Sequence, residues 1–266
     1  MKSLFALTAA AALFAACGND ASTSSKPQTD SVPVAIVDTL DRFDTITANG
    51  YTIMLLPATE ADFNVRDASE WRIPCGENMG EKHFECMSKW LKTQLVTDSA
   101  FVSRPDSVTL RIKLNKGGEL LLRDTLYTEG GEGSTRMNEY VGKLYGLPWV
   151  VVGRSYYEAF DAAIYNLNTG QEVPLYYYPA LSPQKNWLLV YNYDLEAGYT
   201  FNGLQLVNLN GDKAITIFEK AYEKWGATNV KWVSANEAIV EQSVPDYSSP
   251  TYATKKYYAR LVIKEN

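Results

Sequence analysis

The chain has little of what catalytic and metal sites need, with 1 histidine and 3 cysteines among 266 residues. His83 stands between Lys82 and Phe84 in a segment with helical spacing, so we expect a solvated helix residue and not a catalytic base. The cysteines form no CxxC pair, and no GxSxG, HExxH or P-loop motif occurs. We therefore expect a protein that is not an enzyme, with no catalytic residue, no metal and no cofactor.

Positive charge is also scarce. The formal net charge is −6, and lysine and arginine form no cluster along the chain. Because affinity for nucleic acids comes largely from neutralising phosphates, the sequence argues against a nucleic-acid partner.

Hydrophobic runs long enough to span a bilayer are absent. The run Leu4–Ala16 is apolar except for Thr8, but its 13 residues fall short of the roughly 20 that a transmembrane helix requires. It follows Met1-Lys2-Ser3, which carries one positive charge, and it has the length of the apolar region of an export signal.

The end of this run, Phe14-Ala15-Ala16-Cys17, resembles the lipobox of bacterial lipoproteins. The resemblance implies a signal peptide over 1–16 and a mature chain that begins at Cys17, lipidated with palmitate or a similar acyl group. We expect a lipid-anchored protein of the cell envelope, at the outer membrane of a Gram-negative bacterium on its periplasmic or its surface side, with the inner membrane as the alternative. The alternative is an ordinary secretory signal cleaved near Ala16.

The rest of the chain divides by composition. Residues 17–34 are mostly Ser, Thr, Asp and Pro, so we expect the acylated cysteine to be followed by a flexible linker. Residues 35–106 predict a strand at Tyr51–Pro57 and then helices, a short one capped by Thr59 and a longer one over 81–96. In the longer helix Phe84, Met87, Leu91 and Leu95 are three and four residues apart, which predicts an apolar stripe that faces the core. Residues 107–266 predict repeated antiparallel β units that form one domain with the preceding segment.

Cys75 and Cys86 are the two thiols that remain. An exported protein folds in an oxidising compartment, which favours a disulfide between them. Two buried free cysteines are the alternative.

Three predicted hairpins repeat along residues 107–266, each with a turn that contains Asn and Gly, residues that tolerate positive φ. These turns are Asn115–Gly118, Asn168–Gln171 and Asn210–Asp212. Between them lie apolar strands that begin with an aromatic residue, such as Trp149–Val152 and Trp187–Val190.

The stretch Leu181–Asn186 and the phrase 165–170 resemble the repeats of TolB-type, WD40-like β-propellers. We predict a mainly β fold, a propeller-like array of antiparallel hairpins with a helical insertion near residues 59–96. Arg260–Ile263 would be a closing strand that completes an earlier unit. An antiparallel β-sandwich is the alternative.

Tyrosines are abundant, 18 in all, and several fall in the predicted inter-strand loops. Those that recur in corresponding loops, and that we predict as ligand-binding residues, are Tyr156, Tyr157, Tyr193, Tyr199, Tyr247 and Tyr252. Their rings suit stacking on sugars or anchoring a protein partner, while cross-strand packing is the structural alternative.

Three functions follow from these observations. The first is a non-catalytic, membrane-anchored binding or protein-interaction module, and the second is a glycan-binding protein that uses the tyrosine-rich loops. The third is a hydrolase that uses a pair of loop carboxylates, chosen from Glu158, Asp161, Asp194 and Glu196.

Overall fold

The computed structural model describes residues 40–75, 81–125, 135–248 and 253–266. Thr39–Asn266 form one compact unit. Within these described ranges the fold is mainly β, with four antiparallel sheets and two helices, which confirms the predicted class. The predicted signal peptide (1–16) and the acylated linker (17–34) lie outside the described residues.

The sheets follow one another along the chain. Sheet 1 contains β3 (Val102–Asp106), β4 (Thr109–Lys113) and β5 (Glu119–Arg123). Sheet 2 contains β6 (Met137–Leu144), β7 (Trp149–Ser155), β8 (Phe160–Asn166) and β9 (Glu172–Leu175). Sheet 3 contains β10 (Pro179–Leu181), β11 (Trp187–Asn192), β12 (Gly203–Asn210) and β13 (Lys213–Ala221).

Sheet 4 combines the two ends of the described chain. It contains β14 (Gly226–Trp232), β15 (Glu237–Pro245) and β16 (Thr254–Glu265) together with β1 (Asp44–Ala48) and β2 (Tyr51–Ala58). β2 lies antiparallel to β16, with Leu55 opposite Leu261. The predicted strand Arg260–Ile263 is therefore part of β16, and it joins the last sheet to the earliest strands and not to an intermediate unit.

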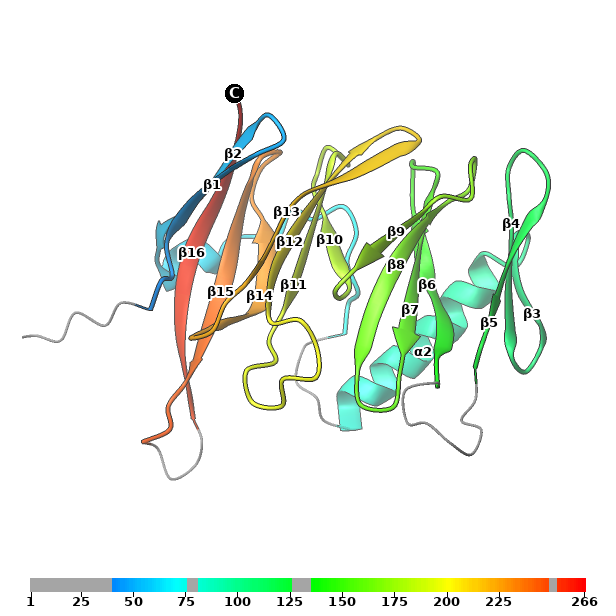
Figure 1. Ribbon diagram of the computed structural model, residues 1–266, viewed down its shortest axis with the longest axis horizontal. Coiled ribbons are helices and arrows are strands. Elements are labelled where there is room, and N and C mark those ends of the chain that lie inside the picture. The colour runs from blue at the N-terminus through cyan, green and yellow to red at the C-terminus, as the bar shows by residue number, and fades with distance from the viewer. Residues whose placement is uncertain (1–39, 76–80, 126–134, 249–252) are drawn as a thin grey trace, which may run out of the picture. The chain divides into compact units, whose positions relative to one another are not determined.

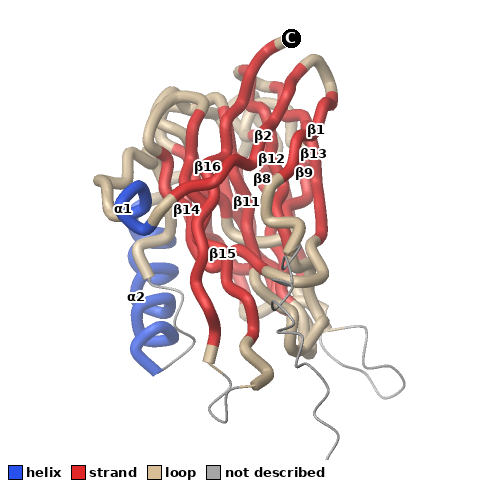
Figure 2. Tube along the Cα trace, turned by 90° about the vertical axis from the view of Figure 1, so that its left-hand side faces the viewer, coloured by secondary structure: helices blue, strands red, loops and turns tan. Residues whose placement is uncertain are grey.

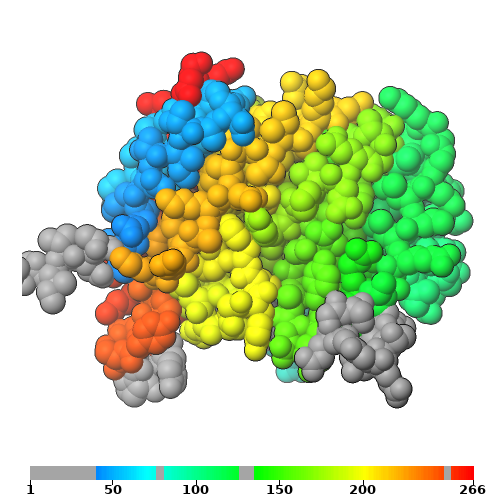
Figure 3. Space-filling model, viewed as in Figure 1, coloured from blue at the N-terminus to red at the C-terminus, as the bar shows by residue number. Residues whose placement is uncertain are grey.

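The sheets pack in a row, as Figures 1 and 3 show. One hydrophobic core joins sheets 3 and 4, a second joins sheets 2 and 3, and a third joins sheets 1 and 2. Among the described residues, no core joins sheet 1 to sheet 4. The predicted array of antiparallel hairpins therefore forms four sheets that follow one another along the chain. A β-sandwich, the alternative, would have two sheets.

Tryptophans at the start of central strands connect sheet 2 to sheet 3 and sheet 3 to sheet 4. Trp149, the first residue of β7, is fully buried, and its indole Nε1 donates a hydrogen bond to the Gly211 carbonyl of sheet 3 at 2.9 Å. Trp187, the first residue of β11, donates to Asn236 Oδ1 beside sheet 4 at 3.1 Å. A buried indole N–H requires an acceptor, so these bonds explain why an aromatic residue leads each strand.

The three predicted hairpins are present, as β4–β5, β8–β9 and β12–β13. Their turns lie at one end of the sheets, which we call the turn end (Figure 1). Positive φ is adopted by the turn glycines, for example +75° at Gly170 and +59° at Gly211, but by none of the three asparagines. The predicted conformational role of the asparagines is therefore wrong.

Two of the three turn asparagines instead form a ladder between neighbouring sheets. Asn115 Nδ2 of sheet 1 donates to Asn168 Oδ1 of sheet 2 at 2.7 Å. Asn168 Nδ2 donates in turn to Asp212 Oδ1 of sheet 3 at 2.6 Å. The Asn ladder (Asn115, Asn168, Asp212) thus gives Asn115 and Asn168 a structural role, while in sheet 3 the aspartate of the turn takes part and not Asn210.

Both helices lie on the same side of the sheets (Figure 2). α1 (Glu60–Phe63) begins with the predicted capping box, in which Thr59 and Asp62 exchange hydrogen bonds between side chain and backbone. α2 (Glu81–Thr97) matches the predicted helix within one residue.

The inner face of α2 differs from the prediction at its first turn. Leu91 and Leu95 pack against the sheet cores, but Phe84, assigned to the same stripe, is 61% exposed. Gln94 is the buried residue of the helix instead. The apolar stripe therefore extends beyond the surface that the sheets cover.

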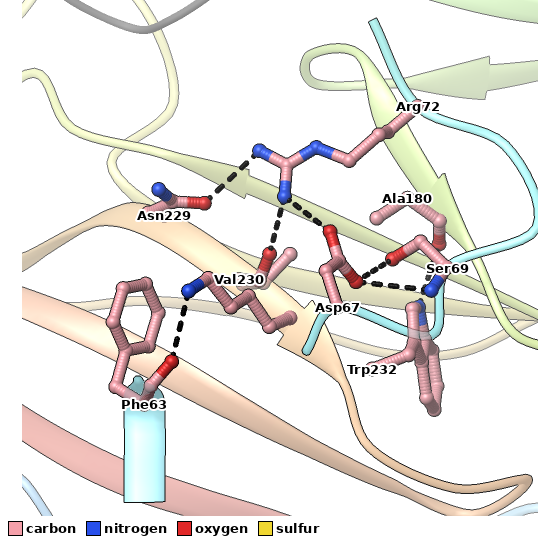
Figure 4. A network of polar contacts seen from close by, with 9 residues as sticks. Phe63, Asp67, Ser69, Arg72, Ala180, Asn229, Val230 and Trp232 are labelled. Carbon is pink, nitrogen blue, oxygen red and sulfur yellow. Dashed lines mark hydrogen bonds and ion pairs between the residues drawn. The ribbon is translucent and has the colours of Figure 1, made fainter. Parts of the chain in front are cut away.

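A polar network fastens the segment after α1 to sheet 4 (Figure 4). Asp67 accepts hydrogen bonds from Ser69 Oγ at 2.6 Å and Arg72 Nη1 at 2.7 Å. Arg72 also donates to the Val230 carbonyl and to Asn229 Oδ1, both at 3.0 Å. Burial favours a higher pKa for Asp67, but the bonds from Ser69 and Arg72 outweigh it and lower that pKa.

Candidate functional site

The end of the sheets opposite the turns, which we call the loop end, carries the connections that contain the predicted tyrosines (Figure 1). The described ones are residues 156–159 between β7 and β8, residues 193–202 between β11 and β12, and residues 246–248 after β15. In antiparallel sheets, alternate connections lie at the same end of the strands. These connections therefore all lie at one end of the stacked sheets.

Asp194 organises the β11–β12 loop from within. Its Oδ1 accepts a hydrogen bond from the Gly198 amide at 3.1 Å, and its Oδ2 accepts from Thr200 Oγ1 at 2.7 Å. The Asp194 amide donates to Asn202 Oδ1 at 3.0 Å, and Asn202 Nδ2 donates to the Trp225 carbonyl at 2.9 Å. The loop is thus fixed both to itself and to the chain that leads into β14.

Arg154 supports the β7–β8 loop from below. This buried side chain forms ion pairs with Asp161 at 2.5 Å and with Glu172 at 2.6 Å. Burial opposes the charged form, but the hydrogen bond and charge of Asp161 prevail and raise the pKa of Arg154. The second Asp161 oxygen accepts from the Tyr156 hydroxyl at 3.2 Å, which orients that ring beside the loop.

A cleft of about 610 Å³ opens between these two loops. We call it the tyrosine cleft. Its volume lies within the range of small-ligand sites, roughly 300–1,000 Å³. The aromatic and acidic residues that line it are Phe84, Tyr156, Tyr157, Glu158, Phe160, Tyr177, Tyr191, Tyr193, Asp194 and Tyr199.

The tyrosines of the cleft differ in what they offer to a ligand. Tyr157 and Tyr199 are 67% and 58% exposed, so their ring faces are available for stacking. Tyr191 is buried and belongs to the wall. Burial raises the pKa of Tyr193 to about 12, with further contributions from Glu196 and Tyr247. The Tyr193 hydroxyl is therefore neutral at physiological pH and can both donate and accept hydrogen bonds.

The predicted ligand-binding tyrosines have three outcomes. Tyr156, Tyr157, Tyr193 and Tyr199 line the one cleft. Tyr247, which is 74% exposed, lines a smaller pocket of about 260 Å³ with Glu196 and Asp246. Tyr252 lies outside the described residues.

Two of the four loop carboxylates, Asp161 and Asp194, have bonds that hold the loops in place. Both oxygens of Asp161 are engaged by Arg154 and Tyr156, and both oxygens of Asp194 accept hydrogen bonds from its own loop. This geometry gives no support to a hydrolase that uses the two as acid and base. In the part of the chain that the structure describes, no group of three His, Cys, Asp or Glu residues could hold a metal ion.

A second concavity, which the sequence reasoning missed, adjoins the tyrosine cleft. It lies beside α2 and has a volume of about 490 Å³. Phe84, Phe160 and Tyr177 line both spaces, so these side chains stand between the two. One residue in the sequence could have indicated this concavity, the apolar Phe84 on the stripe of the helix. An apolar residue at this position is equally typical of a core residue, so the sequence does not distinguish the two.

The cysteines bear on the site through α2. The structure contains a disulfide between Cys75 and Cys86, with Cα atoms 5.6 Å apart. It connects the segment before α2 to the second turn of the helix, next to Phe84. Cys17 lies outside the described residues, and none of the described helices is long and apolar enough to cross a membrane.

Comparisons with known protein families, curated proteins and solved structures find no match to this chain.

Proposed function

We propose that this protein is a non-catalytic binding protein of the cell envelope, held at a membrane by lipid on Cys17, with the tyrosine cleft as its ligand site. One observation carries the proposal. Four tyrosines predicted to bind a ligand come from loops of two different sheets and line a single cleft.

The chemistry of the cleft suits recognition. Its rings offer flat apolar faces, and their hydroxyl groups provide polar contacts at the edges. Asp161 and Asp194 hold the two loops in place through hydrogen bonds and an ion pair, which supports a cleft that is formed before a ligand arrives. A preformed site loses less entropy on binding than a flexible one.

A protein partner is the first candidate ligand, because exposed tyrosines are typical of the residues that dominate binding energy at interfaces. The test compares proteins that co-purify from chemically cross-linked envelopes with the wild type and with a Tyr157→Ala, Tyr199→Ala double variant. Tyr145→Ala is the matched control, since Tyr145 is 49% exposed at the turn end. A partner lost from the double variant and kept by the control supports the proposal. A partner profile that is the same for all three proteins contradicts it.

Glycan binding is the second candidate, and one observation favours it. Tyr157 and Tyr199 stand at the same cleft as polar side chains such as Asn192 and Glu158. Aromatic faces with neighbouring hydrogen-bonding groups suit a sugar ring. A glycan array on the purified protein, followed by calorimetry on the same variants, tests this form. Binding that survives the double variant would exclude the cleft.

The anchor is tested separately. Metabolic labelling with palmitate should mark the wild type and leave a Cys17→Ser variant unlabelled in the same cells. Recovery of unlabelled wild-type protein from the cytosolic fraction would contradict the envelope assignment.

A further inference from the structure

The concavity beside α2 has walls of two kinds. Phe84, Met87 and Leu91 of α2 form one wall, and the other is the aromatic triad, which we define as Phe160, Tyr177 and Tyr178. We call this space the α2 groove. The rings of the triad contact one another, with centroids separated by 4.7 Å (Phe160–Tyr178), 5.2 Å (Tyr177–Tyr178) and 5.4 Å (Phe160–Tyr177).

A carboxylate faces this apolar space. Neighbouring residues of β6 alternate in direction, and Tyr140 belongs to the core that sheet 2 shares with sheet 1. Glu139 therefore faces the other side of the sheet, where it lines the groove, half-buried. Among the described residues, no hydrogen bond or ion pair reaches its carboxylate.

Arg104, whose charge acts on Glu139, has its own hydrogen-bond partners. Arg104 pairs with Asp124 at 3.1 Å and also donates to the Asn138 carbonyl. Burial raises the pKa of Glu139, while Arg104 lowers it and Asp124 raises it. Half-buried carboxylates without a partner are uncommon, because each loses hydration without a compensating bond.

Gly153 makes room for the rings beside this carboxylate. It lies opposite Glu139 in the β6–β7 register. A Cβ atom at this position would stand 2.8 Å from the Tyr178 hydroxyl and 3.2 Å from the Phe160 ring. The glycine thus allows aromatic faces and an unpartnered carboxylate to share one small space.

A carboxylate beside apolar and aromatic walls suits a ligand that has a positively charged group attached to an apolar chain. We propose that the α2 groove binds an organic ammonium ion of small-molecule size. Its ammonium group meets the Glu139 carboxylate, and its alkyl part lies between α2 and the aromatic triad. A carboxylate supplies a charge-assisted hydrogen bond, and aromatic faces attract cations at short range. The volume of about 490 Å³ is that of a small-ligand site.

Two basic side chains, His83 and Lys92, also line the groove. Lys92 lies on an exposed part of α2, and no ion pair joins it to Glu139 in the described structure. An incoming ammonium ion therefore competes with a nearby lysine but displaces no existing bond of Glu139.

The test is calorimetry on the full chain with n-butylammonium, compared with n-butanol as a neutral probe of the same length. We expect the wild type to bind n-butylammonium at least tenfold more tightly than n-butanol. Glu139→Gln should abolish this preference. Glu85→Gln, which removes an exposed charge from α2 outside the groove, should retain it. Equal affinity for the two probes, or a preference that survives Glu139→Gln, would overturn the proposal.

A second probe separates a free amine from a lysine side chain of a peptide. Capped lysine, Nα-acetyl-lysine methylamide, carries the same ammonium group with a peptide backbone. We expect it to bind no more tightly than n-butylammonium. Tenfold tighter binding would overturn the assignment to a small molecule. The α2 groove does not depend on the tyrosine cleft, so Tyr157→Ala should leave the amine preference unchanged.

Discussion

The two ends of the stacked sheets are built from the same strands but use different chemistry. At the turn end, short glycine turns carry the Asn ladder, in which neighbouring sheets exchange side-chain hydrogen bonds. At the loop end, the connections carry exposed tyrosines around a cleft, and Glu139 faces the adjoining groove without a partner. Polar groups that bond each other stabilise a fold, whereas exposed rings and an unpartnered carboxylate are available to a ligand.

Asp67 and Glu139 show the same contrast between two carboxylates, one with bonding partners and one without. Asp67 lies near the last residue of β14, toward the turn end, and accepts bonds from Ser69 and Arg72. Glu139 lies near the first residue of β6, toward the loop end. The pKa of Asp67 is lowered and that of Glu139 is raised. One carboxylate therefore supports the folded state in its charged form, and the other opposes it.

The largest effect is expected from a pair of glycine substitutions, one at each end. A Cβ at Gly203, where β12 begins, would lie 2.1 Å from the Lys220 carbonyl oxygen, so Gly203→Ala should lower the free energy of unfolding by about 3 kcal/mol. Gly211 has φ of +59° and open space around it, so Gly211→Ala should cost about 1 kcal/mol. Urea unfolding measures both. Equal losses would show that the close approach at Gly203 is not rigid.

The next largest effect is expected from Asp67→Asn. Its folded-state pKa is lowered, so the stabilisation is present above the unfolded pKa of about 3.9 and is lost as the pH falls through the folded value. We expect a loss of about 2 kcal/mol at pH 7, because hydrogen bonds to a charged group are removed. The difference from wild type should shrink on acidification through pH 4. A loss that does not vary with pH would contradict the network.

Asn168→Ala tests the ladder. It removes the bonds to Asn115 and Asp212, so the free energy of unfolding should fall by about 1 kcal/mol. Tyr157→Ala at the loop end should change it by less than about 0.5 kcal/mol, because this ring is 67% exposed. Chemical denaturation of both variants under one set of conditions makes the comparison. A larger loss for Tyr157→Ala would make that ring a packing residue.

Glu139→Gln should have a small effect of the opposite sign. Its folded-state pKa is raised, so the charged carboxylate destabilises the folded protein as the pH rises through that value. We expect the variant to be more stable than wild type by about 0.5–1 kcal/mol at pH 7 and equal to it below about pH 4. Thermal melts across this range measure the difference. A less stable variant at pH 7 would mean that Glu139 has a stabilising partner.

Local sequence patterns predicted the elements whose signals are local. The capping box at Thr59 and Asp62, the span of α2 and the three glycine hairpins all follow from spacing and turn chemistry. The convergence of Tyr157 and Tyr199 also followed from the repeat, since connections in corresponding places meet at one end of stacked sheets.

Features that depend on distant partners were beyond such patterns. The role of Asn168 needs Asn115 and Asp212 on other sheets, and the pairing of β16 with β2 joins opposite parts of the chain. Alternation along β6 gives the direction of Glu139 but not what it meets. The exposure of Phe84 depends likewise on where the sheets stop covering α2.

Site-specific photo-crosslinking in intact envelopes tests most directly the claim that the loop end is the recognition end. A photoreactive phenylalanine analogue replaces Tyr157 at the tyrosine cleft or, in a matched chain, Tyr145 at the turn end. The account predicts a discrete covalent adduct from position 157 and none from position 145. Adducts of equal yield from both positions, or an adduct from position 145 alone, would contradict it.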